Sequence, residues 1–293
     1  MERYNELRKG ESGAWLSIFT YLFLAAVKLS IGYLFMSQAL VADGFNNAAD
    51  IIVSVAVLIG LRISQKPPDH DHPYGHFRAE HIAALLASFI MAVIGLQVLY
   101  EAGTSLFSSS IVEPPNILTA WVAGGGAIIM FFVYRYNKKL AKKINSQALA
   151  AAAQDNKNDA LVSVGVVIGI IGSHLHLGWI DSLTAFLIGL IICYTAWTIF
   201  KDTTHSLTDG FNEEALMPFK RTIEKLDQVQ KVRLIKARQV GSSIYADVTI
   251  EVHPHLTVET SHNIADQIEQ KLRDDHDIVH TTVHIEPQKP NQE

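Results

Sequence analysis

The sequence predicts a membrane protein of two parts, an all-α six-helix transmembrane domain over residues 1–208 and a small cytoplasmic α+β domain over residues 209–293. Three observations predict it. Long apolar stretches alternate with short polar ones as far as about residue 205. Beyond that point the composition is typical of a domain that folds in water. Basic residues gather in alternate loops of the apolar part, as they do in multi-span membrane proteins.

Crossing the hydrocarbon core takes about 20 mostly apolar residues per helix. Six stretches satisfy this length, at roughly residues 14–36, 39–63, 81–107, 116–136, 148–173 and 178–200. The second and fifth stretches are the least apolar, because they contain acidic residues. We therefore expect six membrane helices, two of which carry ionisable side chains inside the bilayer.

The distribution of lysine and arginine predicts the orientation. The N-terminus and the second and fourth loops are basic, whereas the first, third and fifth loops have no lysine or arginine. The basic residues are Arg3, Arg8, Lys9, Lys66, Arg78, Arg135, Lys138, Lys139, Lys142 and Lys143. Because cytoplasmic loops of membrane proteins are enriched in positive charge, we expect a multi-pass protein of the cell membrane with both termini in the cytoplasm.

The remaining residues predict the order helix, strand, strand, helix, strand, a small αββαβ layer similar to metallochaperone-type folds. Helices are expected near 213–227 and 258–274. Residues 243–252 alternate between apolar and polar side chains, which indicates a half-buried strand. In the last strand, near 278–286, the same alternation places one set of side chains inward, namely Val279, Thr281, Val283 and Ile285.

Composition limits the partners. The formal net charge is only -5, so no nucleic-acid partner is expected. Cys193 is the sole cysteine, which rules out an intramolecular disulfide and makes a thiolate metal site improbable.

Polar residues inside two of the apolar stretches indicate a functional site. The second stretch carries four of them at the spacing i, i+3, i+4 and i+7, namely Asp43, Asn46, Asn47 and Asp50. Asp155 and Asp159 lie on one face of the fifth stretch, four residues apart. Residue counting places Asp50 and Asp159 near mid-membrane, with Asn46 and Asp155 one turn away on each helix. If the two faces meet, four oxygen-bearing side chains converge: Asn46, Asp50, Asp155 and Asp159.

Burying these acids in lipid requires compensation. An ionised carboxylate near the bilayer centre costs about 2.5–3.5 kcal/mol on insertion scales. A bound divalent cation offsets this cost, and so does protonation. The alternative is a polar network that only holds the helices together. Two acid pairs at matched spacing and depth favour a cation site.

Three motifs together resemble one family: Asn46-xxx-Asp50, Asp155-xxx-Asp159 and the segment DHDHPYGHFRAE after the second stretch. Over nearly its whole length the chain is similar to the cation diffusion facilitators, six-span metal exporters with a cytoplasmic C-terminal domain. The resemblance implies a homodimer that exchanges cytoplasmic metal for external protons. It also implies a transport site on Asn46, Asp50, Asp155 and Asp159.

The transported metal is inferred from the ligand set. Zinc-transporting members usually place a histidine where Asp155 stands, whereas the four side chains here offer only oxygen. Oxygen ligands suit Mn²⁺, Mg²⁺ or Ca²⁺, and imidazole suits Zn²⁺. The sequence also resembles the manganese-exporting branch at Asn46 and Asp155. We expect Mn²⁺ as the transported ion, with Zn²⁺, Fe²⁺ and Co²⁺ as alternatives, and no organic cofactor.

The resemblance implies two further sets of metal ligands. Asp69, His72 and His76 correspond to a cytoplasmic site in the second loop, where a solvated, weakly binding histidine cluster is the alternative. His262, His284 and Glu286 correspond to ligands in the C-terminal domain. Thr249 stands where that second set would have a strand histidine. A histidine-rich surface patch that binds no metal is therefore the alternative interpretation for the C-terminal domain.

Two other functions compete with transport. An intramembrane metalloenzyme would keep an open metal position and a general base, but no HExxH motif and no nucleophile motif lies on a span. A metal receptor without flux is the other alternative. We therefore expect a divalent metal cation/proton antiporter and not an enzyme.

Overall fold

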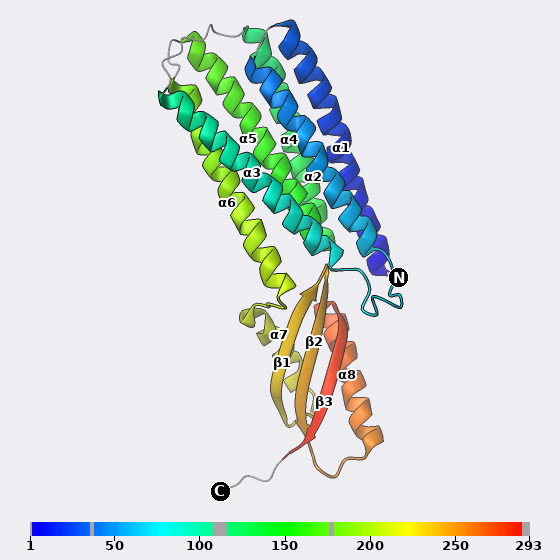
Figure 1. Cartoon of the computed structure of the whole chain (residues 1–293). Helices are drawn as coiled ribbons and strands as arrows, with labels where there is room; N and C mark the ends of the chain where they lie inside the picture. The colour runs from blue at the N-terminus through cyan, green and yellow to red at the C-terminus, as the bar shows by residue number, and fades with distance from the viewer. Residues whose placement is uncertain (1, 36–37, 108–115, 176–178, 289–293) are drawn as a thin grey trace. The chain divides into compact units, whose positions relative to one another are not determined.

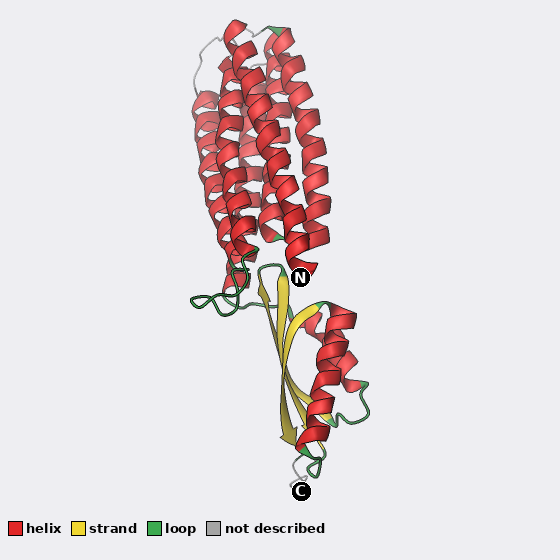
Figure 2. Ribbon diagram, turned by 90° about the vertical axis from the view of Figure 1, so that its right-hand side faces the viewer, coloured by secondary structure: helices red, strands yellow, loops and turns green. Residues whose placement is uncertain are grey.

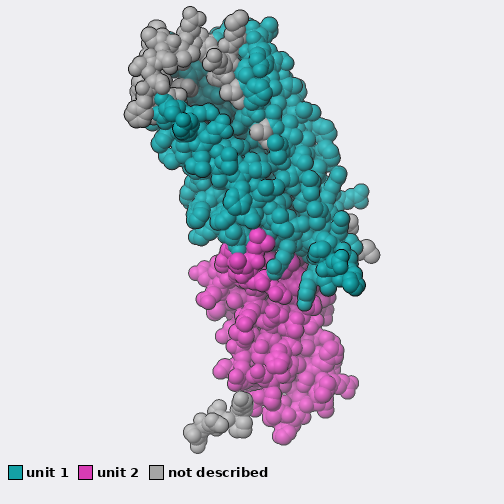
Figure 3. Space-filling view, viewed as in Figure 1, with its two compact units in different colours: residues 1–204 teal, residues 205–293 magenta. Residues whose placement is uncertain are grey.

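The computed structural model describes residues 2–35, 38–107, 116–175 and 179–288. The predicted end of the first span at residue 36 and the predicted start of the sixth at residue 178 lie outside them. The chain divides into two compact units, residues 1–204 and 205–293 (Figure 3).

The first unit is built from six long helices that run side by side (Figure 1). They are α1 (Glu2–Leu34), α2 (Gln38–Ser64), α3 (Ala79–Phe107), α4 (Ile117–Ile144), α5 (Gln147–His174) and α6 (Trp179–Leu207). In the described part of the chain, α1 to α4 are long and apolar enough to cross a membrane. α5 is of similar length, and its first half carries Asp155, Lys157 and Asp159.

Three helices extend well beyond the predicted spans. α1 begins at Glu2 instead of residue 14, α4 continues past residue 136 to Ile144, and α6 continues past residue 200 to Leu207. The polar start of α1 packs closely, since a Cβ at Gly13 would lie 2.5 Å from Asn137 Oδ1 of α4. Asn145 ends α4 in the left-handed conformation with φ 51°, and its N–H bonds to Ala141 O, as asparagine often does at a helix end. The apolar pattern alone predicts only the lipid-facing portion of each helix.

The packing of the helix pairs positions the polar residues. α2 contacts α1, α3 and α5, and α5 also contacts α3 and α4. Small side chains line much of α5 and are buried, among them Ala148, Ala151, Ala152 and Ala153. Small residues let helix backbones approach closely in membranes. The polar faces of α2 and α5 therefore meet inside the unit.

The second unit has the predicted αββαβ order. Its elements are α7 (Glu213–Glu224), β1 (Lys231–Val240), β2 (Ser243–Val252), α8 (Val258–His276) and β3 (Ile278–Pro287). β2 is the central strand, antiparallel to β1 and parallel to β3. Both helices lie on one side of the sheet (Figure 2). The core between them includes Phe219, Ile223, Val248, Ile250, Ile264, Ile268 and Leu272.

The predicted inward set of the last strand is wrong at its first member. Ile278 is buried and pairs with Ile244, whereas Val279 is 38% exposed. The register shifts at this point, because Tyr245 pairs with His280 and leaves Val279 as an extra residue. Such an extra residue is typical of a β-bulge, which a strict two-residue alternation cannot predict.

Candidate cation site

The polar faces of α2 and α5 meet as predicted. Asn46 joins the two helices, because its Nδ2 donates to Asp50 Oδ2 at 3.1 Å and to Asp159 Oδ1 at 3.3 Å. Asn47 Nδ2 donates to the same Asp159 oxygen at 2.5 Å. The side chains of Asn47, Asp50, Asp155 and Asp159 are buried.

Asp155 lies one turn from Asp159 and is held from another direction. Tyr21 of α1 donates its hydroxyl to Asp155 Oδ2 at 3.3 Å, and Asn156 Nδ2 donates to Tyr21 at 3.0 Å. Asn156 Oδ1 in turn accepts from Ser17 and Asn137. A hydrogen-bonded chain across α1, α4 and α5 thus fixes one of the predicted ligands.

Two buried acceptor oxygens in this region lack a donor. In the described part of the chain, Asp159 Oδ2 and Asn47 Oδ1 have no hydrogen-bond partner. Leaving a buried polar group unpaired costs about 1–3 kcal/mol, and more for a charged one. A divalent cation satisfies such oxygens, so the donor set fits a hard cation.

The four predicted ligands do not form a closed coordination sphere. Among the described residues, the only group of three histidine, cysteine or acidic side chains with ligand atoms all within 4.8 Å lies in the loop before α3. The oxygens of Asp50, Asp155 and Asp159 are therefore more widely spaced. Asn46 contacts two of these carboxylates, while Asp155 is held by Tyr21.

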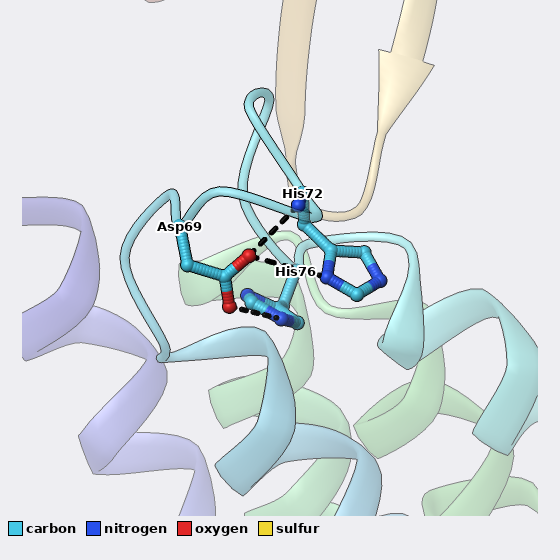
Figure 4. A group of neighbouring side chains, drawn as sticks. All are labelled: Asp69, His72 and His76. Carbon is cyan, nitrogen blue, oxygen red and sulfur yellow. Dashed lines mark hydrogen bonds and ion pairs between the residues drawn. The ribbon is translucent and has the colours of Figure 1, made fainter.

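The loop group is Asp69, His72 and His76 (Figure 4). His72 Nδ1 lies 3.3 Å from Asp69 Oδ1, and His76 Nε2 lies 3.4 Å from Asp69 Oδ2. The two imidazole rings are 4.3 Å apart between centroids. His76 Nδ1 is buried and has no hydrogen-bond partner among the described residues. Two imidazoles and a carboxylate suit a transition metal such as Zn²⁺.

The loop backbone builds this group locally. Asp69 Oδ1 accepts from the backbone N–H groups of Asp71 and His72, at 3.1 and 2.7 Å. The His72 N–H bond, followed by the nearby imidazoles, lowers the pKa of Asp69. Gly75 adopts φ 81°, which closes the turn between the two histidines. His70, in contrast, is fully exposed and lies outside the group.

The C-terminal residues are not brought together within one chain. His262 lies on α8 and pairs with Asp266, at 3.7 Å. His284 pairs with Glu286 at 3.7 Å on β3, and both belong to the face of the sheet opposite the buried core. Thr249 is the direct neighbour of His284 across β2 and β3. The three predicted ligands are thus divided between a helix and the open face of the sheet.

Sequence reasoning missed two contributors to the membrane site. Asn47 makes a shorter hydrogen bond to Asp159 than Asn46 does, and Tyr21 holds Asp155. Asn47 could have been included from its spacing, because it lies on the same polar face as Asn46 and Asp50. Tyr21 carried no such signal, since an aromatic residue within an apolar stretch is ordinary.

Comparison with known proteins identifies the family. Residues 14–208 match the family described as "Cation efflux transmembrane domain", and residues 211–288 match "Cation efflux protein, cytoplasmic domain". The chain belongs to the cation efflux family, the cation diffusion facilitators. It is therefore a metal-cation transporter of the membrane and not an enzyme, and the intramembrane metalloenzyme alternative is wrong.

Two relatives of this cation efflux protein are named manganese efflux system proteins. It is 60% identical over 287 residues to the manganese efflux system protein MneS of Bacillus subtilis, covering 98% of this chain and 99% of MneS. It is 32% identical over 285 residues to MneP of the same organism, covering 94% and 95%. The magnetosome protein MamM of Magnetospirillum gryphiswaldense is 31% identical over 259 residues, covering 87% and 81%. The resemblance inferred from the motifs is confirmed.

Proposed function

We propose that this cation efflux protein exports Mn²⁺ from the cytoplasm in exchange for protons, and that Asn46, Asp50, Asp155 and Asp159 bind the ion between α2 and α5. One observation carries the proposal. The Asn46 side chain contacts a carboxylate of its own helix and a carboxylate of α5, so ligands from both helices share one buried polar region.

The ligand type supports manganese. All four side chains offer oxygen, which suits Mn²⁺ better than Zn²⁺. The names of MneS and MneP, both manganese efflux system proteins, agree with this choice. Zn²⁺, Fe²⁺ and Co²⁺ are the competing ions for the test, since ligand softness and geometry, not raw affinity, must provide selectivity.

The same oxygens account for the exchange of metal for protons. A ligating carboxylate must be deprotonated, so metal binding displaces protons. A carboxylate without its cation is costly in the membrane unless it regains a proton. Metal and protons therefore occupy the site in turn, which is the minimum chemistry of antiport.

We also infer a homodimer in the cell membrane with both termini in the cytoplasm, supported by the match of residues 211–288 to the family's cytoplasmic domain and by the basic loops. Asp69, His72 and His76 would form a second divalent-cation site, supported by their mutual distances. We assign no ion to His262, His284 and Glu286 within one chain, because the helix and the open sheet face separate them.

The experiment is metal uptake into proteoliposomes with an imposed pH gradient. We expect saturable Mn²⁺ uptake that an acidic interior accelerates, with slower uptake of Zn²⁺, Co²⁺ and Fe²⁺. Asp159→Asn should abolish uptake. Asp202→Asn is the matched control, because Asp202 is an exposed acid of α6 outside the site. Normal uptake by Asp159→Asn, or uptake insensitive to the gradient, would contradict the proposal.

A further inference from the structure

A buried ion pair lies beside the proposed cation site. Lys28 of α1 and Asp43 of α2 are joined at 2.9 Å between Nζ and Oδ2, and both side chains are fully buried. Ser163 of α5 bridges them, since its hydroxyl lies 3.0 Å from Lys28 Nζ and 3.3 Å from Asp43 Oδ2. Three helices thus meet at one buried positive charge.

The fourth helix leaves room for the lysine. A Cβ at Gly126 of α4 would lie 3.0 Å from Lys28 Cε and 3.5 Å from Nζ. Side chains larger than glycine at this position would press on the lysine. Lys28 therefore occupies a fitted position and does not extend toward the membrane surface, as a lone lysine in a span often does.

The pair continues the polar faces that form the cation site. Asp43 precedes Asn46 by three residues on α2, and Ser163 follows Asp159 by four residues on α5. Both spacings equal about one helical turn, which is about 5.4 Å along the axis. Lys28 contacts Asp43 and Ser163, so it lies about one turn from the candidate site on both faces. Its charge acts on the same region that binds the ion.

Buried negative charges outnumber buried positive charges in this region. Four buried carboxylates lie along the two faces, namely Asp43, Asp50, Asp155 and Asp159. A dication interacts with each in proportion to charge and inverse distance, and weak screening in the membrane interior strengthens this interaction. A transported ion must also leave, so a site with every carboxylate available would hold it too tightly. Lys28 neutralises the carboxylate of Asp43.

We propose that the Lys28–Asp43 pair, bridged by Ser163, sets the cation affinity of the neighbouring site by keeping a fourth carboxylate from binding the transported ion. The inference rests on the proposed function of the Asn46, Asp50, Asp155 and Asp159 site. Lys28 is a positioning and charge-balancing residue, since it does not itself bind the ion.

Single substitutions should move the affinity in opposite directions. Lys28→Met frees the Asp43 carboxylate to join the site, so the KM for Mn²⁺ should fall and the maximal rate should fall with it, because release slows. Asp43→Asn frees Lys28 to pair with the carboxylates of the site, so the KM should rise. Each change should be at least about tenfold, because the interaction of a unit charge with a dication one turn away reaches that size even with the screening of bulk water. An ion pair with a purely structural role would change both variants in the same direction.

The double variant Lys28→Met/Asp43→Asn should return the KM to within about threefold of the wild-type value, because replacing both members of a buried pair is often tolerated. Ser163→Ala keeps both charges and should change the KM less than either single variant. Lys201→Met is the matched control, since Lys201 is an exposed lysine of α6. All variants are assayed as full-length protein in proteoliposomes, with Mn²⁺ uptake measured at one fixed pH and gradient.

The outcomes separate the two proposals. If Asp159→Asn transports normally, the proposed cation site is wrong. If Asp159→Asn is inactive but Lys28→Met and Asp43→Asn shift the KM in the same direction, or not at all, only the present inference is overturned. If Lys28→Met fails to fold, the inference is tested with Asp43→Asn and the double variant. A KM that stays raised in the double variant would contradict the charge-balancing role of the pair.

Discussion

Replacing Asn47 by alanine tests most specifically whether the Asn47 side chain stabilises ionised Asp159. Asn47 Nδ2 donates to Asp159 Oδ1 at 2.5 Å, and both side chains are buried. Asn46 supplies the other donor to that oxygen, at the longer distance of 3.3 Å. Alanine therefore removes the nearer donor and leaves the weaker one.

The magnitude follows from the charge of the acceptor. A hydrogen bond to a charged group contributes about 1.5–3 kcal/mol. Ionised Asp159 loses this stabilisation in the Asn47→Ala variant. The free energy of cation binding must then offset the loss. Since about 1.4 kcal/mol corresponds to a factor of ten, the KM for Mn²⁺ should rise by roughly ten- to one-hundred-fold.

The assay is Mn²⁺ uptake by proteoliposomes at fixed pH and gradient, with the oligomeric state checked by size-exclusion chromatography. Asn158→Ala is the matched control. Asn158 is also a buried asparagine, but the acceptor of its Nδ2 among the described residues is the weak one of Met91 Sδ, at 3.8 Å. We expect its KM to change less than threefold. An Asn47→Ala variant with a wild-type KM would refute the argument that Asn47 supports Asp159.

Three further predictions concern the loop and the C-terminal unit. Ile250→Ala should lower the stability of β2 by about 2–5 kcal/mol, because Ile250 is fully buried. Hydrogen exchange of the β2 amides measures this loss, and a loss no larger than that caused by Thr249→Ala on the opposite face would contradict the prediction. His76→Gln should lose one bound Zn²⁺ per chain in calorimetry, whereas His70→Gln, at a fully exposed position, should retain it; equal loss would argue against a defined loop site. The His72 N–H holds the pKa of Asp69 below its ordinary value, so this hydrogen bond should persist at every pH at which an ordinary aspartate, with a pKa of about 3.9, is still ionised. Loss of His72 amide protection already above pH 5 would disprove this.

Much of the fold was predictable from the sequence because lipid imposes simple constraints. Apolar stretches predicted the six long helices, and the alternation in residues 243–252 predicted β2. The orientation inferred from the basic loops stays a prediction. The extensions of α1 to Glu2 and of α4 to Ile144 were not predictable from hydropathy, since the helices continue beyond the apolar stretches. The bulge at Val279 could not be predicted from the sequence either, because it depends on how β3 pairs with β2.

The meeting of the polar faces of α2 and α5 was predictable, but the side chains that support them were not, and ion binding by these residues stays a prediction. Helical spacing was enough to place Asn46, Asp50 and Asp159 together. The contact of Tyr21 with Asp155, however, joins residues 134 positions apart, and no local pattern encodes it. The same holds for Lys28, whose partners on α2 and α5 become evident only once the helices are packed.

The central claim is that an all-oxygen site selects Mn²⁺, and Asp155→His tests it most directly. The substitution replaces a charged oxygen ligand by a neutral imidazole, which favours Zn²⁺ over Mn²⁺ by ligand type. The measurement is the ratio of Mn²⁺ to Zn²⁺ flux in proteoliposomes for the wild type and the variant between about pH 6 and 7.5. We predict a lower Mn²⁺ flux, a higher Zn²⁺ flux relative to it, and a steeper pH dependence in that interval. An unchanged flux ratio would contradict the assignment of Asp155 as the ligand that determines selectivity.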